Sequence, residues 1–132
     1  YQYRLKLCEA GEADMEDIIK ISMSAFGDSY DGARAIAANI LNADNRRMFL
    51  GKADGQSVAM GAVANNNGSN SIHGLGVLAE QQGKGYGKEM LYGILKDLLE
   101  RGEEKISLDV NSENQTAFQL YKKIGFEVQS AW

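Results

Sequence analysis

The sequence predicts an α/β (α+β) fold, in which a mixed, mostly antiparallel sheet is flanked by helices on both faces. Segments that alternate apolar and polar residues, typical of half-buried strands, are interleaved with segments whose apolar residues recur at helical spacing. Three consecutive strand segments joined by short polar turns are followed by a strand–helix–strand unit, which implies parallel neighbours in the same sheet. Because the 132 residues contain no repeat and no linker, we expect residues 1–132 to form one domain.

The first half of the chain is predicted to hold a strand, two helices and a hairpin. The hairpin is indicated by Asp54-Gly55, a dipeptide that two-residue turns favour, between two strand-like segments. The helices are indicated by apolar residues three and four positions apart. The expected elements are a strand over residues 3–8, helices over residues 12–26 and 33–41, and strands over residues 47–52 and 57–64.

The second half begins with a polar stretch, residues 65–70, which predicts a second turn. A strand over residues 72–78 leads into a glycine cluster that opens a long amphipathic helix, and Gly102 is placed to end that helix. The run SENQ at residues 112–115 fits a capping box and predicts a further helix, which Gly125 ends. The remaining strands are expected over residues 106–110 and 126–132.

The composition disfavours several classes of protein. The net charge is −4, whereas a sequence-independent nucleic-acid binder normally carries a basic surplus, so we expect no nucleic-acid partner. No apolar run approaches about 18 residues, so we expect no membrane-spanning segment. Cys8 is the only cysteine and His73 the only histidine, so we expect no cysteine-based zinc site and no metal. A single cysteine also favours a cytoplasmic location.

Three glycines lie within residues 83–87, between a predicted strand and a predicted helix. The N–H groups in the first turn of a helix have no partner within the helix, and the helix dipole attracts anions there. Glycines let a ligand approach that turn without a Cβ in the way, and Lys84 and Lys88 add positive charge. The cluster therefore predicts a phosphate-binding loop, with a glycine-rich turn that binds nothing as the alternative.

Two other nucleotide-binding patterns fit less well. A Walker A loop requires a glycine where Gln82 stands and a serine or threonine where Glu89 stands. Residues 74–79 match the letters of a dinucleotide-binding fingerprint, but they lie inside a predicted strand and no helix opens directly after them. Both patterns are therefore disfavoured.

The segment QGKGYG at residues 82–87 resembles the [QR]-x-x-G-x-[GA] signature of the GNAT acetyltransferases. Asn114, Ala117, Tyr121 and residues 125–126 fit the N-x-x-A-x-x-x-Y-x-x-x-G-F pattern of the same family, and the order of elements follows the family across nearly the whole chain. The resemblance implies acetyl-CoA as cosubstrate, with its pyrophosphate bound by the loop. The residues that we assign to the cosubstrate here are Gln82, Gly83, Lys84, Gly85, Tyr86, Gly87, Lys88 and Asn114.

The family's last strand has no counterpart after residues 126–132. We therefore expect either that the chain is a fragment of a longer or tandem protein, or that another chain covers this edge, since an unpaired strand edge favours aggregation. A homodimer and a neighbouring GNAT domain are the two candidate partners.

Direct acetyl transfer needs an uncharged amine, a polarised thioester carbonyl and a proton for the departing thiolate. In the family, the strand before the loop bulges and exposes main-chain groups to the cosubstrate, and Gly74 and Gly76 suit such a bulge. The resemblance therefore assigns Leu75, Gly76 and Val77 to the pantetheine arm and the acetyl group. The alternative is that these glycines only permit the close packing of a helix.

Tyr121 and His73 are the candidate catalytic residues. The resemblance gives Tyr121 the role of general acid toward the thiolate, with a core aromatic residue as the alternative. His73 is expected to share a strand face with Ser71, Leu75 and Val77, and some small-amine acetyltransferases of the family have a histidine here. A histidine side chain, whose ordinary pKa is about 6.5, suits a general base, and a structural histidine is the alternative.

Family members bind the acceptor largely through the first two helices and their connection, which corresponds to residues 22–34 here. Phe26 and Tyr30 are the candidates, and aromatic and acidic residues in this region would suit a cationic amine; an ordinary polar loop is the alternative. The predicted function is transfer of an acetyl group from acetyl-CoA to a primary amine of a small molecule, a peptide or a protein N-terminus. A non-catalytic acetyl-CoA-binding module of a tandem GNAT protein and an unliganded interaction domain are the alternatives.

Overall fold

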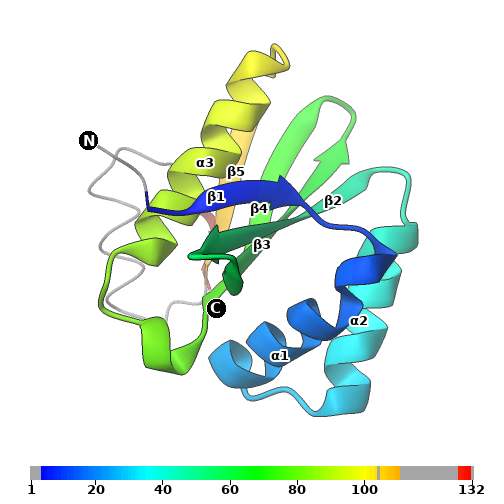
Figure 1. The fold of residues 1–132 in the computed structure, drawn as a ribbon. Helices are drawn as coiled ribbons and strands as arrows, with labels where there is room; N and C mark the ends of the chain where they lie inside the picture. The colour runs from blue at the N-terminus through cyan, green and yellow to red at the C-terminus, as the bar shows by residue number, and fades with distance from the viewer. Residues whose placement is uncertain (1–3, 104, 111–127, 132) are drawn as a thin grey trace.

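The computed structural model describes residues 4–103, 105–110 and 128–131. Within them, a single sheet of six strands carries α1 and α2 on one face and α3 on the other (Figure 1). The helix predicted from residues 112–115 lies outside the described residues. The described elements are β1 (Lys6–Glu9), η1 (Glu12–Asp14), α1 (Met15–Phe26), α2 (Tyr30–Asn42), β2 (Arg46–Ala53), β3 (Gln56–Asn66), β4 (Ser69–Val77), η2 (Ala79–Gln81), α3 (Tyr86–Glu100), β5 (Lys105–Val110) and β6 (Val128–Ala131), where η marks a 3₁₀ helix.

The sheet is mixed and mostly antiparallel. Its strands stand in chain order, and the pairings from β1 to β4 are antiparallel, whereas β4–β5 and β5–β6 are parallel. Because parallel neighbours need a crossover connection, α3 links β4 to β5 across one face of the sheet. The fold class predicted from the sequence is confirmed.

Both described hairpins turn on two residues. The turn predicted at Asp54-Gly55 is present, with the positive φ values, 53° and 80°, of a two-residue hairpin turn. The turn predicted over residues 65–70 is wrong in extent, because β3 and β4 continue into this stretch and leave only Asn67-Gly68 between them. Asparagine side chains pair across the hairpin, with Asn65 Nδ2 donating to Asn70 Oδ1 at 3.0 Å, so these polar residues extend the strands.

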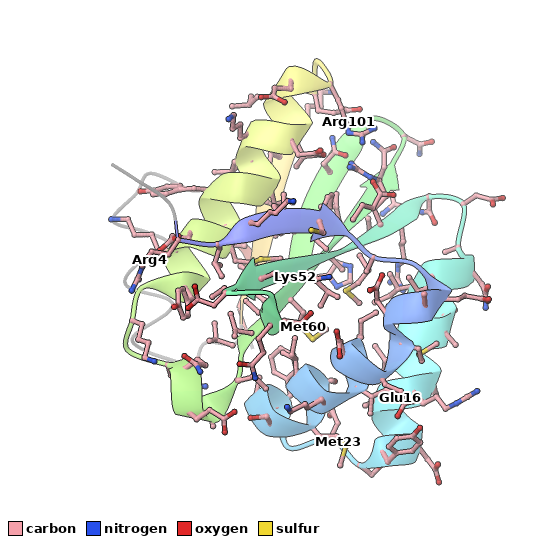
Figure 2. The ribbon with its side chains drawn as sticks, viewed as in Figure 1. Arg4, Glu16, Met23, Lys52, Met60 and Arg101 are labelled. Carbon is pink, nitrogen blue, oxygen red and sulfur yellow. The ribbon has the colours of Figure 1, made fainter. Side chains whose placement is uncertain are left out.

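The sheet buries apolar residues on both faces, and Figure 2 shows Met60 on the side that faces α1. On the opposite face α3 packs closely because two strand positions beneath it are glycines. A Cβ at Gly51 would lie 3.0 Å from the Met90 sulfur, and one at Gly61 would lie 2.8 Å from Ile94 Cδ1. The α3 residues buried against the sheet are Met90, Leu91, Ile94 and Leu98.

This close packing predicts that Gly61→Val destabilises the protein by about 1–3 kcal/mol, since the added methyl groups would have to displace Ile94 and Leu75. Denaturant unfolding measures the loss. Gly11→Ser is the matched control, because a Cβ at Gly11 meets nothing within 4 Å, and we expect a change within about 0.5 kcal/mol there. Equal stability of the Gly61→Val variant and the wild type would contradict this packing.

Candidate active site

The predicted phosphate-binding loop lies between η2 and the first turn of α3. Its residues Gly83 and Gly85 have positive φ, 82° and 85°, which side-chain-bearing residues adopt only with strain. The first backbone hydrogen bond of α3 runs from Glu89 N to the Gly85 carbonyl at 3.1 Å. The N–H groups of residues 86–88 have no acceptor in the described part of the chain. These donors at the positive end of the helix dipole favour an anion.

The surface of the loop is open at two of its three glycines. A Cβ at Gly83 would meet nothing within 4 Å, and one at Gly85 would meet only Arg4 Nη2, at 3.5 Å. Gly87 instead faces β4, where a Cβ would lie 3.8 Å from Val77 Cγ2. The loop therefore offers main-chain donors that an anionic group can approach.

The polar side chains of the loop are engaged within the protein. Gln82 Nε2 donates to the Val77 carbonyl at 3.2 Å and so fixes the loop against the end of β4. Lys84 Nζ donates to Gln81 Oε1 at 2.8 Å. Lys88 Nζ lies 5.6 Å from the centre of the Tyr92 ring. Neither contact holds a lysine ammonium group over the open face of the loop. The hydrogen-bond donors that the structure places there are therefore mainly main-chain N–H groups.

An ion pair beside the loop, between a half-exposed arginine and a buried glutamate, was not predicted from the sequence. The Glu89 side chain is fully buried in the first turn of α3 and accepts hydrogen bonds from the main-chain N–H groups of Arg4 and Leu5, at 2.7 and 3.0 Å. The Arg4 guanidinium donates to Glu89 through Nε at 3.3 Å and Nη2 at 3.2 Å. It also donates to the Lys84 carbonyl and stacks 4.6 Å from the centre of the Tyr86 ring. These contacts hold the two residues that precede β1 against the loop and the first turn of α3.

β4 and β5 separate ahead of the loop. Their parallel pairing ends at Ile72 and Leu108, although β4 continues to Val77 and β5 to Val110. Among the described residues, the main chain of residues 74–77 therefore has no strand partner on the β5 side. The main-chain groups of this stretch and the donors of the loop follow one another along the chain, so one elongated ligand could contact both.

A bulge lies at this point of separation. His73 pairs with Ala62 and Gly76 pairs with Met60, so two residues of β4 stand between these pairs where β3 has one. β4 therefore contains one extra residue. Gly74 takes a φ of 63° within it, and a Cβ there would meet nothing within 4 Å. A glycine is favoured at this position because the backbone is left-handed, and not because a side chain would lack space.

Gly76 fits the packing alternative instead. A Cβ at Gly76 would lie 2.7 Å from Phe26 Cζ and 2.9 Å from the Ala25 Cβ, so the end of α1 packs directly on the strand at this glycine. The two glycines of the strand therefore serve different purposes. Gly76 brings α1, and with it the Phe26 ring, against the main chain of β4.

The prediction that His73 shares a strand face with Leu75 and Val77 is wrong. Leu75 Cδ2 lies 2.8 Å from the position of a Cβ at Gly61, on the α3 face. His73 stands opposite Ala62, the neighbour of Gly61 on β3, and so lies on the α1 face. The extra residue in β4 reverses the alternation of side chains between His73 and Leu75. The imidazole is half-buried on the side of the sheet that α1 covers.

The two candidate acceptor residues lie apart. Phe26 is beside β4, whereas the Tyr30 hydroxyl donates to Glu16 Oε2 at 2.8 Å, in the first turn of α1. Because a helix rises about 1.5 Å per residue, Glu16 and Phe26 stand roughly 15 Å apart along α1. The hydrogen bond to Glu16 also raises the pKa of Tyr30. Only Phe26 is brought to the separated strands.

Comparison with known proteins identifies the family. Residues 14–126 match the sequence model of the acetyltransferase (GNAT) family, which is most of the chain. The chain belongs to the GNAT acetyltransferase family. The matched residues include the loop at residues 82–87 and the separated strands β4 and β5.

Curated relatives match a shorter stretch of this GNAT chain. A mycothiol acetyltransferase from Saccharomonospora viridis is 38% identical over 56 residues, which are 42% of this chain and 18% of that protein. The uncharacterized N-acetyltransferase YycN from Bacillus subtilis is also 38% identical over 56 residues, or 42% of this chain and 36% of that protein. The matched part thus covers well under half the length of either relative.

Solved acetyltransferase structures share the fold of this GNAT chain. The ribosomal-protein-S18-alanine N-acetyltransferase from Escherichia coli aligns with a TM-score of 0.81 and 20% identity, over 93% of this chain and 77% of that one. AAC(6')-Iy in complex with the bisubstrate analogue CoA-S-monomethyl-acetylneamine aligns with a TM-score of 0.76 and 19% identity, over 95% of this chain and 92% of that one. The PaiA N-acetyltransferase from Thermoplasma acidophilum, in complex with coenzyme A, aligns with a TM-score of 0.75 and 16% identity, over 96% of this chain and 92% of that one. At these identities the similarity establishes the fold.

The second GNAT motif cannot be placed, because Asn114 and Tyr121 lie outside the described residues, and their roles stay predictions. Within residues 4–103, 105–110 and 128–131, no three His, Cys, Asp or Glu side chains gather as a metal site would require. Nor does any helix in those ranges combine the length and apolarity needed to cross a bilayer.

Proposed function

We propose that this GNAT chain is an N-acetyltransferase that moves the acetyl group of acetyl-CoA directly to a primary amine of a small molecule, a peptide or a protein N-terminus. The observation that carries the proposal is that an anion-favouring loop follows, after the short helix η2, a strand whose last residues are separated from β5. A cosubstrate with a diphosphate and an extended arm that ends in a thioester would contact both features. Two solved proteins of the same fold are complexes with coenzyme A or a CoA analogue, which supports this choice.

The main chain would bind most of the cosubstrate. The N–H groups of residues 86–88, which have no described acceptor, would bind the diphosphate at the open glycines of the loop. The main-chain groups of Leu75, Gly76 and Val77 would bind the pantetheine arm and polarise the acetyl carbonyl. Gln82 would act indirectly, because its side chain holds the carbonyl of Val77.

The reaction joins the amine nitrogen to the carbonyl carbon, breaks the carbon–sulfur bond, removes one proton from the amine and delivers one to the thiolate. We assign the delivery to Tyr121. A phenol has a pKa of about 10 and a thiol about 8.5, so proton transfer would have to be coupled to cleavage of the carbon–sulfur bond. We assign the removal to His73, acting directly or through water.

The acceptor would approach from the α1 side of the sheet. His73 and Phe26 both lie on that side, next to the separated part of β4. The names of the structural relatives support an amine acceptor, since they include an aminoglycoside N-acetyltransferase and a ribosomal-protein-alanine N-acetyltransferase. Tyr30 remains a weaker candidate, because its hydroxyl bonds to Glu16 away from this region.

A transfer assay tests this function against its non-catalytic alternative. Purified protein is incubated with acetyl-CoA and a panel of aminoglycosides, polyamines, amino acids and N-terminal peptides, and both free thiol and acetylated product are measured. Equal amounts of thiol and product with at least one amine are expected. If acetyl-CoA binds and no amine is acetylated, the alternative of an acetyl-CoA-binding module of a longer GNAT protein replaces this proposal.

His73→Ala is expected to lower turnover by about 10²–10⁴-fold, because it removes the proposed general base. The loss should be largest at and below neutral pH, since free amines become more available as the pH rises. His73→Gln is the control that keeps a polar side chain without basic character, and it should lose as much. Turnover of His73→Ala that stays within about threefold of wild type between roughly pH 6 and 9 would make His73 a structural residue.

A further inference from the structure

The cation placed most firmly beside the loop is Arg4, which belongs to no GNAT motif in this chain. Its guanidinium is fixed on one side by the fully buried Glu89 carboxylate and on another by the Tyr86 ring. Figure 2 shows Arg4 at the start of β1, next to the first turn of α3. Because these contacts are already made, little side-chain freedom would be lost when Arg4 contacts a ligand.

The guanidinium also has donors left for a ligand. Arginine carries five N–H donors, and the bonds of Arg4 to Glu89 and to the Lys84 carbonyl use those on Nε and Nη2. The Nη1 donors have no acceptor among the described residues. The Arg4 side chain is 51% exposed, and Nη2 lies 3.5 Å from where a Cβ at Gly85 would stand.

The two loop lysines are less well placed for this role. Lys84 is bonded to Gln81, and Lys88 lies over the Tyr92 ring. A planar guanidinium also matches the oxygens of a phosphate better than a lysine ammonium does. Arg4 is therefore the charged group that best complements the main-chain donors of the loop.

We propose that Arg4, positioned by Glu89, is a further cosubstrate-binding residue that donates to a phosphate group bound at the loop. This inference rests on the proposed function, because it requires a phosphate-bearing cosubstrate at residues 83–88. It adds to that function a contact that binds the phosphate portion of the donor and leaves the thioester portion unaffected.

The test compares Arg4→Ala with Arg101→Ala. Arg101 has the same kind of contacts, with carboxylate partners Glu9 and Asp97 and 53% side-chain exposure, but lies at the far end of α3 (Figure 2). Calorimetric titration with coenzyme A should show Arg4→Ala binding roughly 10- to 100-fold more weakly, as expected for lost charge-assisted hydrogen bonds. Arg4→Lys should recover part of the loss, and Arg101→Ala should stay within about twofold of wild type.

A second readout separates ligand contact from a structural role. The ratio of kcat/KM for acetyl-CoA to kcat/KM for S-acetyl-pantetheine, which lacks phosphate, should fall in Arg4→Ala by the same factor as the affinity. If Arg4→Ala does not fold, Arg4→Gln takes its place in both measurements. Coenzyme A affinity within about twofold of wild type, or an equal loss with both donors, overturns the role of Arg4. Failure of the wild type to bind coenzyme A would instead overturn the proposed function.

Discussion

Gly85→Glu is expected to abolish coenzyme A binding, by more than about 100-fold in Kd, while the domain still folds. Gly85 has a φ of 85° and lies at the N-cap of α3, so a side chain there would stand beside the N–H groups of residues 86–88, which have no acceptor among the described residues. A glutamate would add negative charge where we propose that phosphate binds. The strain of a non-glycine residue at this φ costs about 1–3 kcal/mol, which a stable domain can tolerate. Calorimetric titration with coenzyme A measures the effect.

Gly102→Glu is the matched control for this change. Gly102 has a similar φ of 80° just beyond the C-terminal end of α3, and a Cβ there meets nothing within 4 Å. The variant therefore introduces the same strain and the same charge far from the loop, and its affinity for coenzyme A should stay near that of wild type. Similar affinities for the Gly85→Glu and Gly102→Glu variants would show that phosphate does not bind at the loop.

Tyr121→Phe is expected to lower turnover by about 10²-fold or more while affinity for acetyl-CoA changes by only a few fold. The substitution removes one oxygen and keeps the ring, so only the proposed proton donor is lost. With an acyl donor whose thiol is more acidic, the difference in turnover between the wild type and Tyr121→Phe should be smaller, because a better leaving group needs less protonation. Steady-state kinetics with both donors, together with a binding titration, measure these effects.

Tyr92→Phe serves as the control for the loss of a phenol, because Tyr92 lies on α3 and has no role in the proposed reaction. It should keep wild-type turnover. A Tyr121→Phe variant with unchanged turnover would remove Tyr121 from the mechanism. Joint loss of acetyl-CoA binding and turnover would make Tyr121 a binding residue instead of a general acid.

The sequence was most informative where function depends on main-chain conformation. Glycines at 83 and 85 predicted an open helix N-terminus, and both have the positive φ that the prediction requires. Gly74 predicted a bulge in β4, and the register with β3 contains it. These features are local, so the residue types that permit them are visible in a short stretch of sequence.

Features that depend on distant contacts were missed or misplaced. Arg4 and Glu89 are 85 positions apart, and no short-range pattern pairs a residue before β1 with the first turn of α3. Strict alternation predicts that His73 shares a face with Leu75, whereas the one extra residue of the bulge places the two side chains on opposite faces. Nearness in sequence groups Tyr30 with Phe26, yet the Tyr30 hydroxyl bonds to Glu16 at the other end of α1.

Thermal unfolding with and without acetyl-CoA tests the central claim most directly. A ligand that binds only the folded protein stabilises it by about 2.7 kcal/mol at a concentration one hundred times its Kd, and the Tm rises with further ligand. We therefore predict a concentration-dependent increase in Tm for the wild type that is absent in Gly85→Glu. No shift in the Tm of the wild type at millimolar acetyl-CoA would contradict the proposal that this chain is an acetyl-CoA-dependent transferase.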